Sequence, residues 1–331
     1  METISLNDLP VLVTGAGGFI GSRLVEALCA RGARVRAFVR YNSRADAGLL
    51  KTLPSEVLAS VEIIMGDLRD EDALEKAAAG TALVFHLGAL ISIPYSYQHP
   101  VEVVQTNILG TLAVLQACRK NGARLIHTST SEVYGTALRV PIDEQHPLQG
   151  QSPYSASKIG ADKLVESYYR AFGVPAVTIR PFNTYGPGQS ARAVIPTIIT
   201  QALQAEEIHL GNLEARRDFT YLDDTVAAFI KAAETPGIDG ETFNLGSGQE
   251  VSIRQLTEEI LALTGSQARV VVDEERLRPE KSEVLRLLAD NSKARRVLDW
   301  KPKVGLREGL TQTIAWVRAH MDFYRPGHYE R

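Results

Sequence analysis

Two side chains in the middle of the sequence have the types and spacing of an acid–base pair. Tyr154 and Lys158 occur in the segment "PYSASK", four positions apart, which places them on one face of a helix. A phenol has a pKa of about 10 and is a weak base at neutral pH, but a neighbouring ammonium group favours the phenolate and lowers that pKa. We therefore expect Tyr154 to remove the proton of a substrate hydroxyl group while a hydride leaves the carbon that carries it.

A single carboxylate follows a predicted strand shortly before this pair. The segment "HTSTSEVYG" places Glu132 after a strand expected over 124–128, and strand ends are common positions for functional groups on a rigid scaffold. Thr130, at the same strand end, is placed to hydrogen-bond the hydroxyl group that Tyr154 deprotonates, and Ser131 follows it. A lone glutamate in a turn is usually a solvated residue, so a role for Glu132 depends on its surroundings.

Three glycines near the N-terminus predict a binding site for a dinucleotide. In "VLVTGAGGFIG", Gly15, Gly18 and Gly21 follow the first predicted strand and open a helix. Glycine permits a tight turn and lets backbone N–H groups approach a diphosphate at the positive end of that helix. A glycine triplet alone is weak support, but this one begins a chain of alternating strands and helices. We therefore expect this turn to hold the diphosphate of NADP or NAD.

The end of the second predicted strand bears on which dinucleotide binds. Sites for NAD commonly place an acidic residue there to hold the ribose 2′-hydroxyl group, and the segment "AFVRYNSR" contains none. Arg40 and Arg44, helped by Asn42 and Ser43, would instead neutralise a 2′-phosphate. The alternative is that these arginines form a solvated surface. The pattern favours NADP over NAD.

The candidate residues lie in a chain whose strands and helices alternate, which predicts a parallel sheet with helices on both faces. The expected strands are 11–14, 35–39, 61–65, 82–87, 124–128, 176–180 and 242–245, and the expected helices include 22–31, 71–79, 102–120 and 154–172. Turns and irregular segments are expected to dominate 181–222 and 252–331. We predict an α/β fold, a Rossmann-type doubly wound parallel sheet with a smaller, discontinuous C-terminal substrate domain. The expected NAD(P)-binding domain comprises 1–182 and about 221–250, and the expected nucleotide-sugar-binding domain comprises about 183–220 and 251–331.

The composition is that of a water-soluble globular enzyme. The 331 residues are 44% hydrophobic and 23% charged, with a formal net charge of −3, which favours neither nucleic acid nor a membrane surface as a partner. The sequence shows no signal peptide and no apolar run of the ~20 residues that span a bilayer, so a cytoplasmic protein is expected. Cys29 and Cys118 lie in helical segments without metal-ligand spacing, so buried thiols and no metal site are expected.

The glycine spacing, the Tyr-x-x-x-Lys pair and the chain length resemble the extended short-chain dehydrogenases, in particular the NAD(P)-dependent sugar-nucleotide epimerase/dehydratase family. The resemblance covers essentially the whole chain. It includes the family's substrate loop in "RPFNTYGPGQ", its R-D-[FWY]-x-Y-V-x-D segment in "RRDFTYLDDT" and its C-terminal signature in "RLRPEKSEVLRLLADNSKARRVLDWKP". The resemblance implies that Asn183 contacts the phosphates of a sugar nucleotide, and that Arg217 and Arg278 bind its diphosphate, as suits guanidinium groups. Trp300 would serve in packing.

The resemblance also implies further positions at the cofactor, the sugar and the subunit interface. Asp67, at the end of the third strand, would read the adenine edge of a cofactor that stays tightly bound and is regenerated in each turnover. Tyr95 and Tyr97 lie in the loop that borders the sugar, and Val194 is expected at the substrate. Helices 102–120 and 154–172 match the pair that builds a dimer interface in this family, so a homodimer is expected. The other residues expected at the cofactor are Phe19, Ile20, Leu68, Leu87, Gly88, Ala89, Tyr154 and Lys158.

Within the family, the triplet Thr130-Ser131-Glu132 resembles that of a nucleotide-sugar 4,6-dehydratase, a lyase. Such an enzyme oxidises C4, a carboxylate removes the acidified C5 proton, the 6-hydroxyl group leaves as water, and hydride returns to C6. Many hexose dehydratases carry Thr-Asp-Glu, whereas GDP-mannose dehydratases carry Thr-Ser-Glu, so Glu132 is expected to act first as base and then as acid. Together with the loop around Tyr95, the chain looks most like the N-acetylglucosamine nucleotide 4,6-dehydratases of the legionaminic-acid type.

Three other functions stay open from the sequence. A nucleotide-sugar C4 epimerase shares the oxidation but needs no base at position 132, where such enzymes often carry serine or alanine. A UDP-glucuronate decarboxylase also has Thr-Ser-Glu, but usually carries arginine where this chain has Ile159. A dinucleotide sensor without activity is disfavoured by the intact Tyr154 and Lys158. The residues do not separate UDP-linked from GDP-linked substrates.

Overall fold

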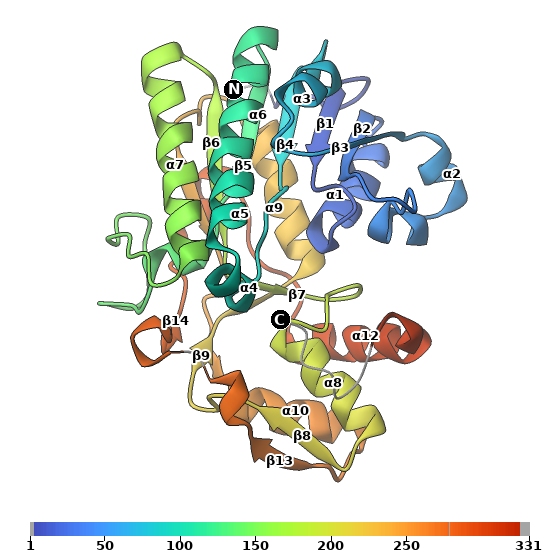
Figure 1. The fold of residues 1–331 in the computed structure, drawn as a ribbon, viewed down its shortest axis with the longest axis vertical. Coiled ribbons are helices and arrows are strands. Elements are labelled where there is room, and N and C mark those ends of the chain that lie inside the picture. Colours follow the sequence, from blue (N-terminus) through green and yellow to red (C-terminus); the bar gives the residue numbers. More distant parts are fainter. Residues whose placement is uncertain (1–2, 278, 325–331) are drawn as a thin grey trace.

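A parallel sheet of seven strands forms the centre of the molecule (Figure 1). The computed structural model describes residues 3–277 and 279–324. The strands lie in the order β11-β6-β5-β4-β1-β2-β3, and every pairing between them is parallel. The doubly wound α/β sheet predicted from the sequence is therefore confirmed. The strands are β1 (Pro10–Thr14), β2 (Arg34–Arg40), β3 (Glu62–Gly66), β4 (Leu83–His86), β5 (Arg124–Thr128), β6 (Ala176–Pro181) and β11 (Thr242–Leu245).

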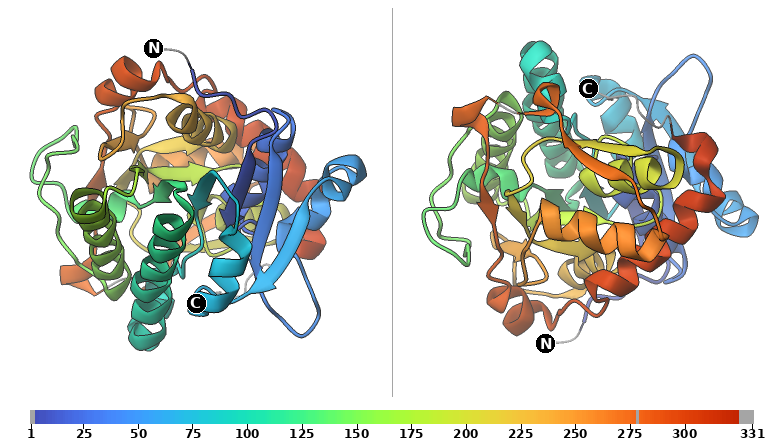
Figure 2. Two further views of the ribbon diagram at one scale, coloured as in Figure 1. Left: turned by 90° about the horizontal axis from the view of Figure 1, so that it is seen from above. Right: turned by 90° about the horizontal axis from the view of Figure 1, so that it is seen from below.

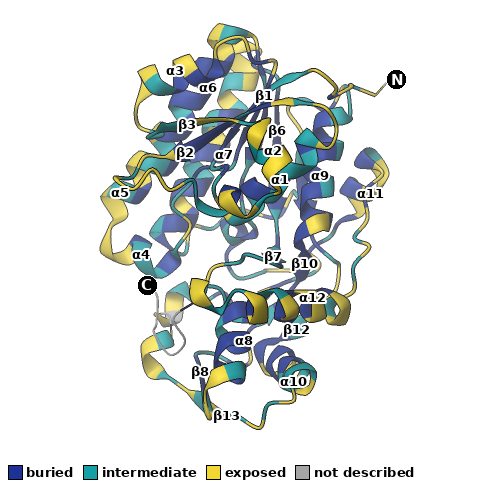
Figure 3. Cartoon of the chain, turned by 90° about the vertical axis from the view of Figure 1, so that its right-hand side faces the viewer, coloured by how far each residue is buried: buried dark blue, intermediate teal, exposed yellow. Residues whose placement is uncertain are grey.

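Helices cover both faces of this sheet (Figure 2), and its inner strands are buried between them (Figure 3). In β1, Leu12 belongs to the hydrophobic core on one face, and Val11 and Val13 belong to the core on the other. This alternation is the two-residue period that a strand imposes. The first face is covered by α3 (Glu71–Ala78), α6 (Gly110–Asn121) and α7 (Pro153–Phe172), and the second by α1 (Phe19–Cys29) and α9 (Leu222–Glu234).

The helix predicted over 102–120 consists of three parts. α5 (Pro100–Val104) continues through a π-helical turn (Gln105–Leu109) into α6. In that turn the buried side chain of Asn107 bonds the backbone of Leu90 and the hydroxyl group of Ser157 on α7. Such turns often occur near functional sites, because they redirect a side chain within a helix.

The same stretch is more apolar than the sequence analysis allows for. Residues Pro100–Asn121 are long and hydrophobic enough to cross a membrane by length and composition alone, and half of the tested window is buried inside the protein. The expectation that no apolar run reaches this length is therefore wrong. The packing of α6 in one core with α3 and α7 explains the composition, since a core helix needs the same residue types.

The C-terminal part contains helices where the sequence analysis expects mainly turns. The apolar residues of α8 are largely β-branched and one is a proline, which obscures helical propensity. Tertiary burial overrides this, because Ile195, Ile198 and Ile199 are almost fully enclosed. The helices concerned are α8 (Val194–Gln204), α10 (Ile253–Thr264), α11 (Ser292–Leu298) and α12 (Leu306–Ala319).

Three small sheets also belong to this part. The first joins β8 (Glu207–Leu210) to β13 (Arg269–Val272), and the second joins β10 (Phe219–Tyr221) to β7 (Asn183–Tyr185). In the third, β9 (Arg216–Arg217) pairs with β12 (Val251–Ser252) and β14 (Arg286–Leu287).

These elements enclose a hydrophobic core of their own, below the seven-stranded sheet in Figure 1. Ile198 of α8, Leu256 of α10 and Leu310 of α12 meet there without exposure to solvent. α10 begins with a capping box, in which Ser252 and Gln255 each bond the backbone N–H group of the other. This reciprocal cap is the local signal that marks the start of α10 in the sequence.

Trp300 and Cys118 occupy the buried positions that the sequence predicts. The indole N–H group of Trp300 donates to the carbonyl oxygen of Asp224 at 2.8 Å, and burial raises the pKa of the Cys118 thiol to about 12. Cys29 is only partly buried, so the prediction of a fully buried thiol is wrong there. Cys29 is the last residue of α1, and side chains at the end of a helix are covered less by neighbouring elements.

Asp218 joins three segments between the sheet and the C-terminal part. Its fully buried carboxylate accepts hydrogen bonds from the backbone N–H groups of Ser247, Gly248 and Ala289 and from the hydroxyl group of Ser247, at 2.6–3.2 Å. Burial raises the pKa of Asp218, and these bonds oppose that rise. The carboxylate therefore satisfies several donors at this junction.

We expect Asp218→Ala to destabilise the fold. The change leaves the donors of Ser247, Gly248 and Ala289 without their acceptor, at a cost of about 1–3 kcal/mol for each buried group. The Tm measured by circular dichroism should fall by about 5 °C or more. Asp223→Ala is the control, because Asp223 is exposed and pairs with Arg23 at the surface, where an ion pair contributes ~0–1 kcal/mol. Equal Tm values for the two variants contradict the role given to Asp218.

Candidate active site

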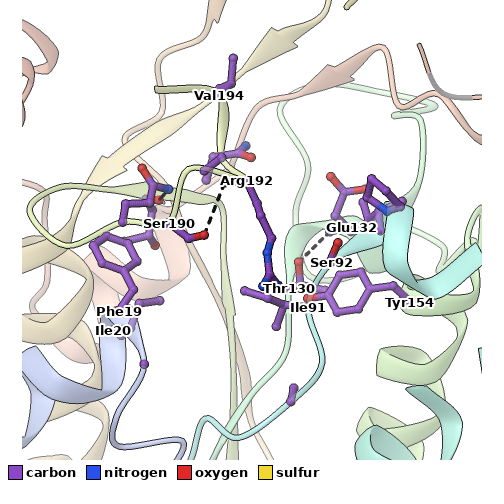
Figure 4. A pocket seen from close by; sticks show the side chains of 18 of the residues that line it. Phe19, Ile20, Ile91, Ser92, Thr130, Glu132, Tyr154, Ser190, Arg192 and Val194 are labelled. Carbon is purple, nitrogen blue, oxygen red and sulfur yellow. Dashed lines mark hydrogen bonds between the residues drawn. The ribbon is translucent and has the colours of Figure 1, made fainter. Parts of the chain in front are cut away.

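A large cavity lies where the strands of the parallel sheet end. Its volume is about 1420 Å³, and residues that follow β1, β4, β5 and β6 at their carboxyl ends line one side of it. The start of α8 and loops of the C-terminal part form the opposite wall. Ligands bind at this edge of open α/β sheets because strand ends and helix N-termini converge there. Figure 4 shows part of this cavity.

The turn between β1 and α1 has the close backbone approach that a diphosphate site requires. Gly15 has a φ of 69°, and a Cβ atom there would come within 2.7 Å of the backbone nitrogen of Gly88. A Cβ atom on Gly21 would lie 2.2 Å from the carbonyl oxygen of Gly15. Gly18, the N-cap of α1, has no side chain to cover the helix end that lines the cavity. The turn therefore fits the diphosphate of a dinucleotide.

The loop after β2 lines the cavity with the four residues that the sequence analysis singles out: Arg40, Asn42, Ser43 and Arg44. The guanidinium group of Arg40 lies 3.3 Å from the carboxylate of Glu102, so its charge is partly compensated. Asp46 also lines the cavity, and its carboxylate accepts the backbone N–H group of Gly48 at 2.9 Å. Sequence reasoning missed this acid because it looked only at the end of the strand.

Of the other residues predicted at the cofactor, Asp67 and Leu68 do not line the cavity. Asp67 is bonded by the guanidinium group of Arg69 at 2.6 Å, which lowers the pKa of the carboxyl group to about 2. Leu68 packs behind the strand ends, where its side chain would meet a Cβ atom on Gly88. Contact of Asp67 and Leu68 with a cofactor stays a prediction. The residues that do line the cavity are Phe19, Ile20, Leu87, Gly88 and Ala89.

Glu132 is held in a short turn directly after β5. Residues Ser131–Tyr134 form a 3-10 helix, and the hydroxyl group of Thr130 caps it by accepting the backbone N–H group of Glu132 at 3.2 Å. Ser131 and Val133 on either side are buried, so the turn is anchored around the carboxylate. Thr130, Ser131 and Glu132 all line the cavity, and Figure 4 shows Glu132 near Thr130 and Tyr154.

Tyr154 and Lys158 project from the first two turns of α7. The helix starts at Pro153, after a capping box formed by Ser152 and Ser155, so the position of Tyr154 is fixed from its first turn. Tyr154 lines the cavity, whereas Lys158 lies beneath it and donates a hydrogen bond from Nζ to the carbonyl oxygen of Thr128 at 2.7 Å. The helix face and β5 thus bring the pair to the strand end that carries Thr130 and Glu132.

Burial dominates the protonation of this pair. It raises the pKa of the Tyr154 phenol, a rise that the bond with Thr130 opposes and the charge of Glu132 adds to. In the protein alone, burial therefore acts against the lowered pKa that is expected for Tyr154 beside Lys158 and a bound nicotinamide, because four-residue spacing does not report desolvation. The lowered pKa stays a prediction for the protein with its cofactor. Burial also lowers the pKa of Lys158 to about 8, against the influence of Asp162.

The residues predicted at the substrate separate into three groups. Asn183, Val194 and Arg217 line the cavity, and Arg217 is buried, with its guanidinium group bonded to the carbonyl oxygen of Arg216 at 3.0 Å. Tyr95 does not line it, because its hydroxyl group donates to Glu102 at 2.5 Å. Arg278 lies outside the described residues.

Two further residues of the cavity bear on the sugar site. Tyr97 lines the cavity, and its hydroxyl group forms a hydrogen bond of 2.5 Å with the hydroxyl group of Ser282. Arg192 lies in the loop before α8, and Figure 4 shows it reaching toward Ile91 and Thr130. Sequence reasoning missed Arg192. The signal was its position three residues after the end of "RPFNTYGPGQ", the segment that resembles a substrate loop.

A glycine turn after β1 and a Tyr-x-x-x-Lys helix beside β5 are the features of a short-chain dehydrogenase, and the fold and the site together place the chain in that class. Residues 12–313 match the family model described as GDP-mannose 4,6 dehydratase. The chain therefore belongs to the extended, NAD-dependent sugar-nucleotide epimerase/dehydratase family of enzymes, as its motifs indicate.

Relatives in this family include both dehydratases and epimerases. A UDP-glucose 4-epimerase of Mycolicibacterium smegmatis is 34% identical over 315 residues, which are 93% of this chain and 98% of the relative. A dTDP-glucose 4,6-dehydratase of Streptomyces antibioticus is 32% identical over 322 residues, 96% of this chain and 94% of the relative. The structure of a dTDP-glucose 4,6-dehydratase from Streptomyces venezuelae with NAD bound has a TM-score of 0.84 at 30% identity, and the match covers 96% of this chain and 99% of the other.

We expect Gly21→Ala to abolish dinucleotide binding while the protein stays folded. The added methyl group would collide with the backbone of Gly15 and open the turn that fits a diphosphate. Isothermal titration with NAD and NADP measures the loss, which should exceed about 100-fold if even two hydrogen bonds to the diphosphate are lost, each worth ~1.5 kcal/mol or more. Gly305→Ala is the matched control, because a Cβ atom there meets nothing within 4 Å. Unchanged binding by Gly21→Ala contradicts the assignment of the turn.

Proposed function

We propose that the protein is a nucleotide-sugar 4,6-dehydratase that converts an NDP-N-acetylglucosamine or a related NDP-hexose into a 4-keto-6-deoxy sugar. The observation that carries the proposal is the position of Glu132, held by its own turn in the cavity beside Thr130 and Tyr154 (Figure 4). Removal of the C5 proton needs a base at this place, whereas inversion at C4 does not.

Each residue of the group has one task in the proposed reaction. When bound, the nicotinamide cofactor accepts hydride from C4 and supplies hydride for C6. Tyr154 removes the proton of the C4 hydroxyl group, Thr130 orients that hydroxyl group, and Lys158 favours the ionised phenol from below. The resulting C4 ketone acidifies the C5 proton. Glu132 takes that proton and then gives it to the 6-hydroxyl group, which leaves as water. The 5,6-ene that remains would take up the hydride at C6 and a proton from solvent at C5.

A C4 epimerase is the second candidate, and the 34% identity with a UDP-glucose 4-epimerase favours it. It would use the same Tyr154, Lys158 and Thr130, and Glu132 would be a bystander. Incubation with UDP- and GDP-N-acetylglucosamine separates the two functions by mass spectrometry, because dehydration removes one water and epimerisation changes no mass. A product with an intact 6-hydroxyl group rejects the dehydratase.

The opposite wall supports a nucleotide sugar as the substrate. Arg217 of this wall and Asn183, which follows β6, both line the cavity, and two such polar groups suit the oxygens of a diphosphate. Arg192 reaches into the cavity near Thr130, and we assign it a contact with the sugar nucleotide. The nucleotide, UDP or GDP, stays open. N-acetylglucosamine as the sugar stays a prediction that rests on the resemblance to the legionaminic-acid type.

We further propose a homodimer and the two-domain division expected from the sequence. Val101, Val104 and Leu109 are exposed along α5 and the π-helical turn, and Phe172 is exposed at the end of α7. Exposed apolar side chains on these helices support burial against a second copy. The separate hydrophobic core around α8, α10 and α12 supports a substrate domain distinct from the sheet.

We predict that Glu132→Gln stops the reaction after oxidation. Glutamine keeps the volume of the side chain but cannot accept the C5 proton, while Tyr154, Lys158 and Thr130 remain. Dehydration should slow by ~10²–10⁴-fold, the usual cost of losing a general base. Reduced cofactor should accumulate, visible by its absorbance, and solvent deuterium should no longer enter at C5.

Tyr154→Phe is the matched control for this variant. It keeps Glu132 and removes the phenol hydroxyl group, so the cofactor should not become reduced at all when substrate is added. Stopped-flow absorbance of the reduced cofactor distinguishes the two variants, because the cofactor becomes reduced in Glu132→Gln and stays oxidised in Tyr154→Phe. Near-normal dehydration by Glu132→Gln would show that Glu132 is only structural and that another group removes the C5 proton.

The cofactor prediction can be tested at the loop after β2. Arg40 and Arg44 line the cavity and support NADP, whereas the relative from Streptomyces venezuelae binds NAD and gives the preference no support. Replacing both arginines by alanine should weaken NADP by about tenfold or more relative to NAD, since each charge-assisted bond contributes ~1.5–3 kcal/mol. Arg31→Ala, at an exposed pair with Glu234, is the control. Tighter binding of NAD than of NADP by the unmodified protein refutes the preference.

A further inference from the structure

A buried carboxylate lies directly beneath the proposed catalytic pair without touching the cavity. Asp162 follows Lys158 by one turn on the same face of α7, as Lys158 follows Tyr154. Its side chain is 4% exposed and accepts hydrogen bonds from the hydroxyl group of Ser129 at 2.8 Å and from the guanidinium group of Arg180 at 2.9 Å. It is absent from the residues that line the cavity. The mechanism proposed above does not use it.

A histidine that contacts this carboxylate, His127, and a second one stacked on it, His86, carry no charge near neutral pH. Burial lowers the pKa of His86 and of His127. The Nε2 atom of His127 lies 3.2 Å from Asp162, and its Nδ1 atom has no hydrogen-bond partner among the described residues, which suits a neutral ring that donates from Nε2. The titratable groups around Lys158 are His86 on β4, His127 on β5, Glu132 in the turn after β5, Tyr154 and Asp162 on α7, and Arg180 on β6.

Two buried cations therefore share one buried anion. Lys158 and Arg180 are both almost fully enclosed, and the charges of both act on Asp162. Burial opposes the ionisation of Asp162, but its bond with His127 and the charges of Arg180 and Lys158 lower its pKa to about 2. Asp162 is therefore an anion throughout the physiological range. Burial brings the pKa of Lys158 down to about 8, and the charge of Asp162 opposes any further fall.

We propose that Asp162 is a positioning residue for the oxidation step: its carboxylate keeps Lys158 in the ammonium form at neutral pH, and Arg180 limits this effect by sharing that carboxylate. The inference rests on the part of the proposed function that dehydratases and epimerases have in common, the oxidation of C4 by Tyr154 with Lys158. With Tyr154 protonated, Lys158, Arg180 and Asp162 carry a net charge of about +1, which an ionised phenol would cancel.

The test is the pH dependence of kcat/KM for consumption of the nucleotide sugar, whichever product forms. The holoenzyme should lose activity as the pH rises through about 8, where Lys158 loses its proton. Asp162→Asn should move this alkaline limb down by about one pH unit or more, because an opposite charge nearby is removed. Arg180→Gln should move it up, because the whole carboxylate then acts on Lys158. Ser129→Ala is the control: it removes a bond to Asp162, leaves the charge, and should leave the limb in place.

The opposed shifts distinguish this role from a structural one. A merely structural carboxylate would lower kcat/KM at every pH and leave the alkaline limb unmoved. Shifts in the same direction, or no shift in either folded variant, overturn the inference. If one variant does not fold, the direction of the other decides. A product that proves to be a C4 epimer overturns the dehydratase proposal and leaves this test intact, because consumption of the sugar nucleotide begins with the same oxidation.

Discussion

The burial of two cations under one cavity is the constraint on which the site depends. Lys158 and Arg180 are both removed from water, and unpaired buried charges are costly. The carboxylate of Asp162 compensates them, and its hydrogen bonds also tie Ser129 after β5 and Arg180 on β6 to α7. The relative positions of the strand end and the helix are therefore set by charge compensation below the cavity.

The same network reaches the turn that carries Glu132. The phenol of Tyr134, the last residue of that turn, accepts a hydrogen bond from Arg180 at 2.9 Å and donates one to Asn244 of β11 at 2.7 Å. Tyr134 is fully buried, so the turn is anchored by the cation that shares Asp162 with Lys158. Thr130 caps the other end of the turn. The acid–base groups thus stand on one continuous set of buried bonds.

Sequence reasoning succeeded where the signal is local. The strands 124–128 and 242–245 are observed with the same bounds, because short runs of apolar and β-branched residues bounded by turns have few alternatives. The glycine spacing and the Tyr-x-x-x-Lys pair likewise depend only on local geometry, that of a tight turn and of one helix face. The segments "PYSASK" and "HTSTSEVYG" predicted Tyr154 and Glu132 at one site, and both residues line the same cavity. Their roles stay predictions.

Prediction from the sequence failed where packing between residues far apart in the chain determines the structure. α8 is helical because Ile195 and Ile198 are buried against α10 and α12, not because of its own propensity. Arg192 reaches the cavity through the path of a loop, and only its position shortly after "RPFNTYGPGQ" points to it in the sequence. The protonation of Tyr154 depends on desolvation by the whole fold, which the spacing of Tyr154 and Lys158 along α7 does not record.

The side chains of the site come from separate structural elements. This explains how one family can contain both dehydratases and epimerases at about 30% identity to this chain. The oxidising pair stands on α7, and its electrostatic support comes from β5 and β6. Glu132 comes from a separate turn, capped by Thr130 and anchored by Tyr134. Under the proposed mechanism, a substitution at position 132 would add or remove the base for C5 without altering Lys158 or Asp162. The oxidation of C4 and the fate of the ketone would then depend on separate parts of the fold.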